Sequence, residues 1–149
     1  MYNKILVPTM GKYMKQLVDH TLKFVDGRNA EIIVLYVVDD DVPFLTPTLL
    51  KKDMIKELAL KGGYFLDKSE KLIDLESNPN ISLRKILKKG KPNEVIVDVA
   101  REEEVEMIVL GSGKNILDKH ILGSVSEKVI HHAPCNIFLI RTLNKEFTE

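Results

Sequence analysis

The sequence predicts an α/β fold, with a single open five-stranded parallel sheet and helices on both of its faces. First, five short apolar runs alternate with segments whose apolar residues recur at helical steps, and this order is typical of parallel sheets. Second, four of the runs are rich in Ile, Val and Leu without strict alternation, as in strands buried on both faces. The predicted strands are 4–8, 30–38, 81–87, 105–111 and 135–141.

The first helix is predicted between strands 4–8 and 30–38, where apolar residues follow three- and four-residue steps. Gly27 is a typical residue to end it. The apolar positions are Met14, Leu17, Val18, Leu22 and Val25.

A longer second helix is predicted after Pro47, with its first apolar residues at Leu50, Met54, Ile55 and Leu58. Gly62 and Gly63 lie inside it, and each costs about 1 kcal/mol relative to alanine. We therefore expect a kink or break there. The preceding segment 39–48 contains two prolines and is a candidate lid.

The third strand, 81–87, alternates polar and apolar residues, which predicts partial exposure at a sheet edge. Pro92 is well placed to begin the third helix. Ser124 and Glu127 have capping-box spacing at the start of the last helix, and Pro134 should end that helix. The third helix should bury Val95, Ile96, Val99 and Ala100.

Composition excludes several classes of protein. A chain of 149 residues fits one domain. Its 22 Lys and Arg balance 22 Asp and Glu, so charge gives no general case for nucleic-acid binding. The single cysteine, Cys135, excludes an internal disulfide framework. No apolar run reaches the roughly 20 residues of a membrane helix, and the N-terminus resembles a strand rather than a signal peptide. We therefore expect a cytoplasmic protein with neither nucleic-acid nor membrane partners.

A glycine-containing segment follows the fourth strand, with Gly111, Gly113 and Gly123. A Walker loop would need Ser or Thr at Asn115, and a dinucleotide fingerprint would need glycine at Ile116. Neither pattern fits. Glycines let a backbone approach a phosphate, however, and the helix that follows would present its N-terminus to an anion. The segment is therefore a candidate phosphate loop of another kind.

Segment 105–141 resembles the C-terminal half of universal stress protein domains. Their loop has a glycine, two residues, a glycine, nine residues and then Gly-Ser or Gly-Thr; the nine residues 114–122 separate Gly113 from Gly123 here. KILVPT and LYVVD resemble the first two strands of these domains, whereas 39–80 is poorly marked. The resemblance implies one such domain over 1–149, with an adenine nucleotide alpha hydrolase-like, Rossmann-like three-layer sandwich.

The resemblance also implies a ligand, ATP, with ADP and AMP as alternatives and Mg²⁺ only alongside the nucleotide. The adenine would lie against the first two strands, and the phosphates against the glycine loop. Lys114 would neutralise a phosphate or remain solvated, and Ser124 would contact a phosphate or act only as a cap. The implied ligand-binding residues are Pro8, Thr9, Met10, Val37, Leu110, Gly111, Gly113, Lys114, Gly123, Ser124, Val125 and Ser126.

Two features depart from the family pattern. Nucleotide-binding members usually have an aspartate that contacts the ribose where this chain has Met10. The loss of one such hydrogen bond costs about 1–2 kcal/mol, or roughly tenfold in affinity. The first glycine pair is also one residue short, because Gly111 and Gly113 enclose only Ser112. The loop should therefore begin along a different path.

Three functions remain open on the sequence alone. The first is a regulatory module that binds an adenine nucleotide. The second is a structural or interaction protein that has lost this binding, as Met10 and the shortened glycine pair indicate. The third and weakest is a slow nucleotide hydrolase, because Asp118 and Glu127 are the only carboxylates near the loop and the cap accounts for Glu127. His131 and His132 lack the spaced partners of a metal site.

The last strand, Cys135 to Arg141, predicts a homodimer. It ends the βα series, so its outer edge should be exposed, and no proline or charge interrupts its apolar centre. Such an edge is an aggregation risk unless another strand pairs with it. The family resemblance suggests the same pairing, which would place two copies around a two-fold axis.

Overall fold

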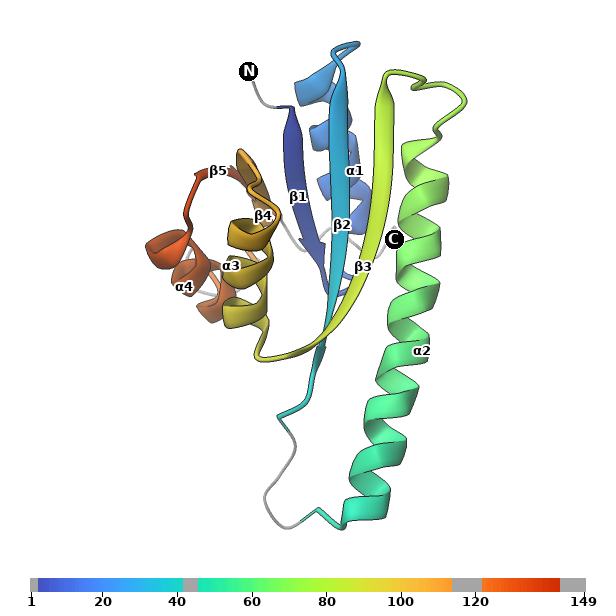
Figure 1. Cartoon of the computed structure of the whole chain (residues 1–149), viewed down its shortest axis with the longest axis vertical. Coiled ribbons are helices and arrows are strands. Elements are labelled where there is room, and N and C mark those ends of the chain that lie inside the picture. Colours follow the sequence, from blue (N-terminus) through green and yellow to red (C-terminus); the bar gives the residue numbers. More distant parts are fainter. Residues whose placement is uncertain (1–2, 42–45, 114–121, 143–149) are drawn as a thin grey trace.

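A computed structural model describes residues 3–41, 46–113 and 122–142 of the chain (Figure 1). The predicted alternation of strands and helices is confirmed. The elements are β1 (Lys4–Thr9), α1 (Met14–Val25), β2 (Ala30–Asp39), α2 (Thr48–Ile73), β3 (Ile81–Gly90), α3 (Pro92–Glu102), β4 (Met107–Gly111), α4 (Ser124–His132) and β5 (Asn136–Ile140).

The five strands form one parallel sheet in the order β3-β2-β1-β4-β5. From β1 the chain runs outward to β3, then returns to place β4 and β5 on the other side of β1. The strand order therefore reverses between β1 and β4, and ligands of open sheets bind beyond the carboxyl ends of the strands at such a point.

Two apolar cores lie on opposite faces of the sheet, as the predicted fold requires. Side chains of α1 and α2 pack on one face, with Met14 and Ile73 among the most buried. Side chains of α3 and α4 pack on the other, with Val99 and Val129 at its centre. β1, β2 and β4 are buried between these layers, which explains why their sequences do not alternate.

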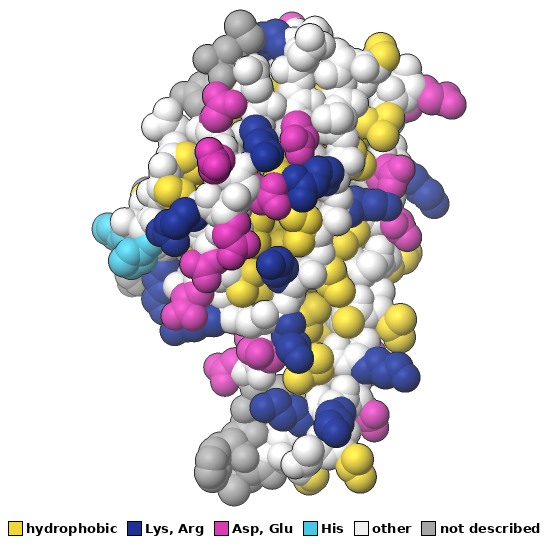
Figure 2. All heavy atoms as spheres, in the orientation of Figure 1, with side chains coloured by type: hydrophobic (Ala, Val, Ile, Leu, Met, Phe, Trp, Pro, Cys, Tyr) yellow, Lys and Arg dark blue, Asp and Glu magenta, His cyan; other side chains and the backbone are white. Residues whose placement is uncertain are grey.

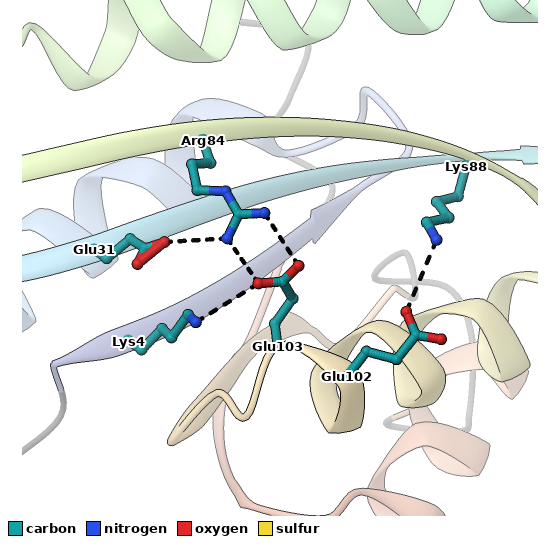
Figure 3. Close-up of polar contacts among 6 residues, drawn as sticks. All are labelled: Lys4, Glu31, Arg84, Lys88, Glu102 and Glu103. Carbon is teal, nitrogen blue, oxygen red and sulfur yellow. Dashed lines mark hydrogen bonds and ion pairs between the residues drawn. The ribbon is translucent and has the colours of Figure 1, made fainter.

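β3 is an edge strand and is partly exposed, as its alternating sequence predicts. Arg84 on β3 donates to both carboxylate oxygens of Glu103 at 2.7 and 3.1 Å and contacts Glu31 on β2 at 3.4 Å (Figure 3). Lys4 on β1 lies 3.6 Å from the Glu103 carboxylate. The Arg84 hydrogen bond lowers the pKa of Glu103. Acidic and basic side chains are interleaved on this face, with hydrophobic side chains between them (Figure 2).

The break expected in the second helix is wrong, because α2 runs without interruption over 26 residues (Figure 1). It begins at Thr48 with Pro47 as N-cap. A Cβ atom on Gly62 would lie 2.6 Å from side-chain carbons of both Tyr36 and Leu87. Gly62 therefore allows the helix to approach β2 and β3 closely, and this packing offsets the low helix propensity of glycine.

The capping box expected at Ser124 and Glu127 is also wrong. Gly123 is the N-cap of α4, and the Glu127 N–H donates to the Gly123 carbonyl at 3.0 Å. No side chain caps the helix. The helix begins one residue earlier than a capping box with Ser124 as N-cap would require, so Ser124 is its first residue. Of the candidate lid, residues 42–45 lie outside the described part of the chain.

Candidate functional site

A pocket of about 400 Å³ lies at the carboxyl ends of β1 and β4, where the strand order reverses. Its lining includes every predicted ligand-binding residue except Lys114, which lies outside the described residues. Asp118 also lies outside them, and Glu127 is exposed and absent from the lining. Sequence reasoning missed five residues that line the pocket, namely Lys12, Tyr13, Leu17, Pro92 and Ile96.

One side of the pocket is apolar. Val37 at the end of β2 and Leu110 at the end of β4 are both buried, and Ile96 of α3 packs in the same core. Pro8 of β1 contributes the floor of this side. Strands and a packed helix hold these groups, so the surface is rigid and suits a flat, largely apolar ring.

The turn between β1 and α1 forms the second wall. The Thr9 hydroxyl is buried and accepts the Gly11 N–H at 3.0 Å, so it shapes the turn. Met10 is 49% exposed, and its thioether is a weak hydrogen-bond acceptor. Lys12 is exposed and also lines the pocket. Tyr13 is the N-cap of α1, in a left-handed conformation.

The glycine segment forms the third wall, and its hydrogen bonds differ from those that the resemblance implies. The Gly113 N–H donates to Thr142 Oγ1 at 3.1 Å, and the Gly123 N–H donates to the Ser112 carbonyl at 2.7 Å. The Ser126 hydroxyl donates to the Gly111 carbonyl at 2.8 Å. These hydrogen bonds hold together the described ends of the glycine segment, 111–113 and 123–126. Gly113 has φ 74°, a conformation that favours glycine.

The N-terminus of α4 remains as an anion-binding element. Its first-turn N–H groups, on Ser124, Val125 and Ser126, have no intrahelical acceptor and no side-chain cap, and all three residues line the pocket. α1 and α3 also begin here, since the lining includes Tyr13, the N-cap of α1, and Pro92, the first residue of α3. Among the described lining residues Lys12 is the one cation and none is Asp, Glu or His. The described wall therefore favours a negative charge.

The sequence as a whole matches the model of the universal stress protein family over residues 1–141. The chain belongs to the universal stress protein family. A universal stress protein of Methanothermobacter thermautotrophicus is 55% identical over 143 residues, which cover 96% of this chain and 98% of the relative.

Solved structures of the family share this fold. The universal stress protein UspA from Lactobacillus plantarum superposes with a TM-score of 0.80 at 28% identity, over 94% of this chain and 98% of that one. A family protein from Arabidopsis thaliana with AMP bound has a TM-score of 0.61 at 21% identity, over 99% of this chain and 95% of that one. The predicted Rossmann-like fold of the adenine nucleotide alpha hydrolase type is confirmed.

Other chemistry has little support in the part of the chain that the structure describes. No group of three or more His, Cys, Asp and Glu side chains there could hold a metal ion. No helix in that part combines the length and apolar character needed to cross a membrane. Cys135 is half-buried, and burial raises the pKa of its thiol, so it remains a protonated, weakly reactive group at neutral pH.

Proposed function

We propose that this protein is a regulatory module of the universal stress type that binds ATP, or a related adenine nucleotide, with little or no hydrolysis. The observation that carries the proposal is one pocket with two chemically different sides. Val37 and Leu110 offer a buried apolar surface, and the uncapped N-terminus of α4 offers N–H groups to an anion. An adenine nucleotide likewise has a flat, largely apolar ring at one end and negatively charged phosphates at the other.

In the proposed complex the adenine lies against Pro8, Thr9, Val37 and Leu110. The phosphates lie beside Gly111, Gly113 and Gly123, and accept hydrogen bonds from the first turn of α4. Lys12 supplies a positive charge at the mouth. Because the described lining has no carboxylate, Mg²⁺ would accompany the nucleotide, bound through its phosphates. ADP and AMP remain alternatives, and the Arabidopsis relative with AMP bound supports the shorter ligand.

A binding role agrees better with this lining than hydrolysis does. An efficient ATPase positions the attacking water with a polar or acidic side chain and holds its metal with carboxylates. The described lining has no Asp, Glu or His to serve either purpose. We also propose that the protein is a cytoplasmic stress-response regulator, built as a single domain over 1–149.

The test has three steps. Denaturation and mass spectrometry of the purified protein will identify any nucleotide that it carries. Calorimetric titration with ATP, ADP, AMP and adenosine will then rank affinities, and a phosphate-release assay will measure turnover. Saturable binding with turnover near background agrees with the proposal. Turnover at ordinary enzyme rates would instead establish a hydrolase.

A structural or interaction protein that has lost nucleotide binding is the second candidate. Its specific support is that the Gly113 and Gly123 amides donate to Thr142 and Ser112 rather than pointing free, together with Met10 in the ribose position. This candidate predicts no binding of any of the four titrants. It also predicts that replacing Met10 with aspartate restores nothing.

We further propose a homodimer through the last strand, Cys135 to Arg141, which contains β5. β5 is an edge strand, and Leu139 on it is 40% exposed. Leu87 on the opposite edge, β3, is 43% exposed and is a matched control. A buried lysine at a strand–strand interface is unfavourable. Light scattering should therefore show a dimer for the native chain and for Leu87→Lys, but a monomer for Leu139→Lys. A native monomer at tens of micromolar would contradict this pairing.

A further inference from the structure

A pair of buried hydroxyl groups joins the glycine segment to the end of the last strand. Ser112 lies between Gly111 and Gly113, and Thr142 lies two residues beyond the end of β5. Both are buried, and Thr142 has no exposed surface. Their side-chain oxygens are 3.2 Å apart. Buried hydroxyls require hydrogen-bond partners, so the contacts of this pair indicate what it holds in place.

Four hydrogen bonds hold the pair between β5 and the glycine segment. The Ser112 N–H donates to the Ile140 carbonyl at 2.9 Å, one residue beyond the paired ends of β4 and β5. The Thr142 N–H donates to Ser112 Oγ at 3.1 Å, and the Gly113 N–H donates to Thr142 Oγ1 at 3.1 Å. The Ser112 carbonyl accepts the Gly123 N–H at 2.7 Å. Thr142 thus fixes Gly113 directly and the start of α4 through Ser112.

Packing agrees with the hydrogen bonds. A Cβ atom on Gly111 would lie 2.9 Å from Thr142 Cγ2, closer than such atoms approach in proteins. The Thr142 methyl group therefore occupies the space that Gly111 leaves. A Cβ on Gly113 would meet no atom closer than 3.8 Å, so that glycine is required by its φ of 74° and not by crowding. The glycine at position 111 is thereby explained by its fit against Thr142.

We infer that Thr142 is a positioning residue for the phosphate side of the pocket. Its hydroxyl fixes the Gly113 backbone directly and, through Ser112, the position of the α4 N-terminus. The effect on a ligand rests on the proposed function, whereas the effect on the loop does not. Removal of the hydroxyl should loosen the loop and weaken contacts to phosphate, and should leave contacts to adenine unchanged.

Three variants separate this role from general stability. Thr142→Val keeps the shape of the side chain and removes the hydroxyl, whereas Thr142→Ser keeps the hydroxyl and removes the methyl group. Thr21→Val is the matched control, because Thr21 is 1% exposed and its hydroxyl donates to the Leu17 carbonyl at 2.6 Å within α1. Circular dichroism must show that each variant is folded; if Thr142→Val is not, Thr142→Ala takes its place.

The first measurement is amide hydrogen exchange in the protein without nucleotide. We expect exchange of the Gly113 amide to quicken by about tenfold or more in Thr142→Val, because Gly113 loses its acceptor. Exchange of the Gly123 amide should quicken by a smaller factor, because its acceptor, the Ser112 carbonyl, is then held less firmly. Thr142→Ser should stay within about threefold of the native chain, and Thr21→Val should leave both amides unchanged. Unchanged exchange in Thr142→Val would overturn the inference.

The second measurement compares ATP with adenosine. Thr142→Val should weaken ATP binding by about tenfold and leave adenosine binding unchanged. Thr142→Ser, which keeps the hydroxyl, should bind ATP as the native chain does. Equal losses for both ligands would reduce Thr142 to a general structural role and overturn the inference. A native chain that binds neither ligand is a different failure: it contradicts the proposed function, while the exchange result still decides whether Thr142 fixes the loop.

Discussion

Two hollows lie at opposite ends of the sheet, and the larger one is the poorer candidate for an anion. The hollow at the amino ends of β2 and β3 has a volume of about 670 Å³, against about 400 Å³ for the pocket at the carboxyl ends of β1 and β4. Residues that follow α1 and α2 line the larger hollow, including Arg28 and Asn80. Residues that begin α1, α3 and α4 line the smaller pocket.

The direction of the surrounding helices therefore matters more than the volume of a hollow in deciding where an anion binds. In a parallel sheet with helical crossovers, helices end at the amino edge and begin at the carboxyl edge. The amino-end hollow therefore lies near partial negative charges and the carboxyl-end pocket near partial positive ones. The cations also differ. Arg28 donates to the Val25 carbonyl at 3.0 Å and to the Phe24 carbonyl, so its charge serves the end of α1.

Of the variants that distinguish the two hollows, Gly123→Val should have the largest effect on ATP binding. Its side chain would occupy the space beside the first turn of α4, and ATP binding should fall below detection by calorimetry. Gly123→Ala fits the folded chain, because a Cβ there would lie 3.5 Å from the nearest atom, the Ser112 carbonyl oxygen. Ser82→Val adds similar bulk to the larger hollow and should leave ATP affinity unchanged. Loss of ATP binding in Ser82→Val but not in Gly123→Val would show that the nucleotide binds in the hollow at the amino ends of the strands.

Charge reversal should separate the two hollows by a smaller amount. Lys12→Glu places a negative charge at the mouth of the pocket, and ATP affinity should fall by about tenfold, with adenosine affected far less. Arg28→Glu should lower the melting temperature, because α1 loses its C-terminal partner, yet leave ATP affinity unchanged. Titration at two salt concentrations provides a check, since the Lys12 contribution should shrink at high salt.

Met10→Asp should increase the affinity of the pocket for nucleotide. A carboxylate after β1 supplies a strong acceptor for ribose hydroxyls, and we expect ATP and AMP to bind about tenfold more tightly. Met10→Leu removes the sulfur atom without adding an acceptor and should match the native chain. A tighter complex with both variants would show that the effect is not a hydrogen bond to ribose.

Glu103→Gln should have the smallest effect and none on ligand affinity, because Glu103 lies on the charged face and not in the pocket. The Arg84 bridge holds the pKa of Glu103 below its ordinary value of 4.5. The bridge therefore stabilises the fold above about pH 4.5, and this contribution is lost as the pH falls through the lowered pKa. Melting curves should show a small deficit for Glu103→Gln at pH 7 that fades in acid.

Much of the fold and pocket could be predicted because local patterns determine them. Buried strands such as 30–38 are continuous apolar runs, and the spacing from Gly113 to Gly123, together with the resemblance of the residues around it, marks the loop. The failures involve contacts that no local pattern encodes. Gly62 suits an unbroken helix only because β2 and β3 bring Tyr36 and Leu87 beneath it.

Thr142 is a similar case. It meets Ser112, 30 residues away in sequence, only because β4 and β5 are neighbours in the sheet. Lys12 could have been suspected from its place after the first strand, since residues at that end of the sheet approach the ligand site. The capping box failed by one residue, because Gly123 in an extended conformation served as N-cap in place of Ser124.

The most direct test of the account is calorimetric titration of ATP into the native chain, after any bound nucleotide has been removed. We predict one saturable site per chain, with heat that disappears in Gly123→Val and affinity that rises in Met10→Asp. ADP and AMP, tested in the same way, should compete for that site. No heat from ATP, ADP or AMP with either the native chain or Met10→Asp would contradict nucleotide binding and favour an interaction protein built on the same fold.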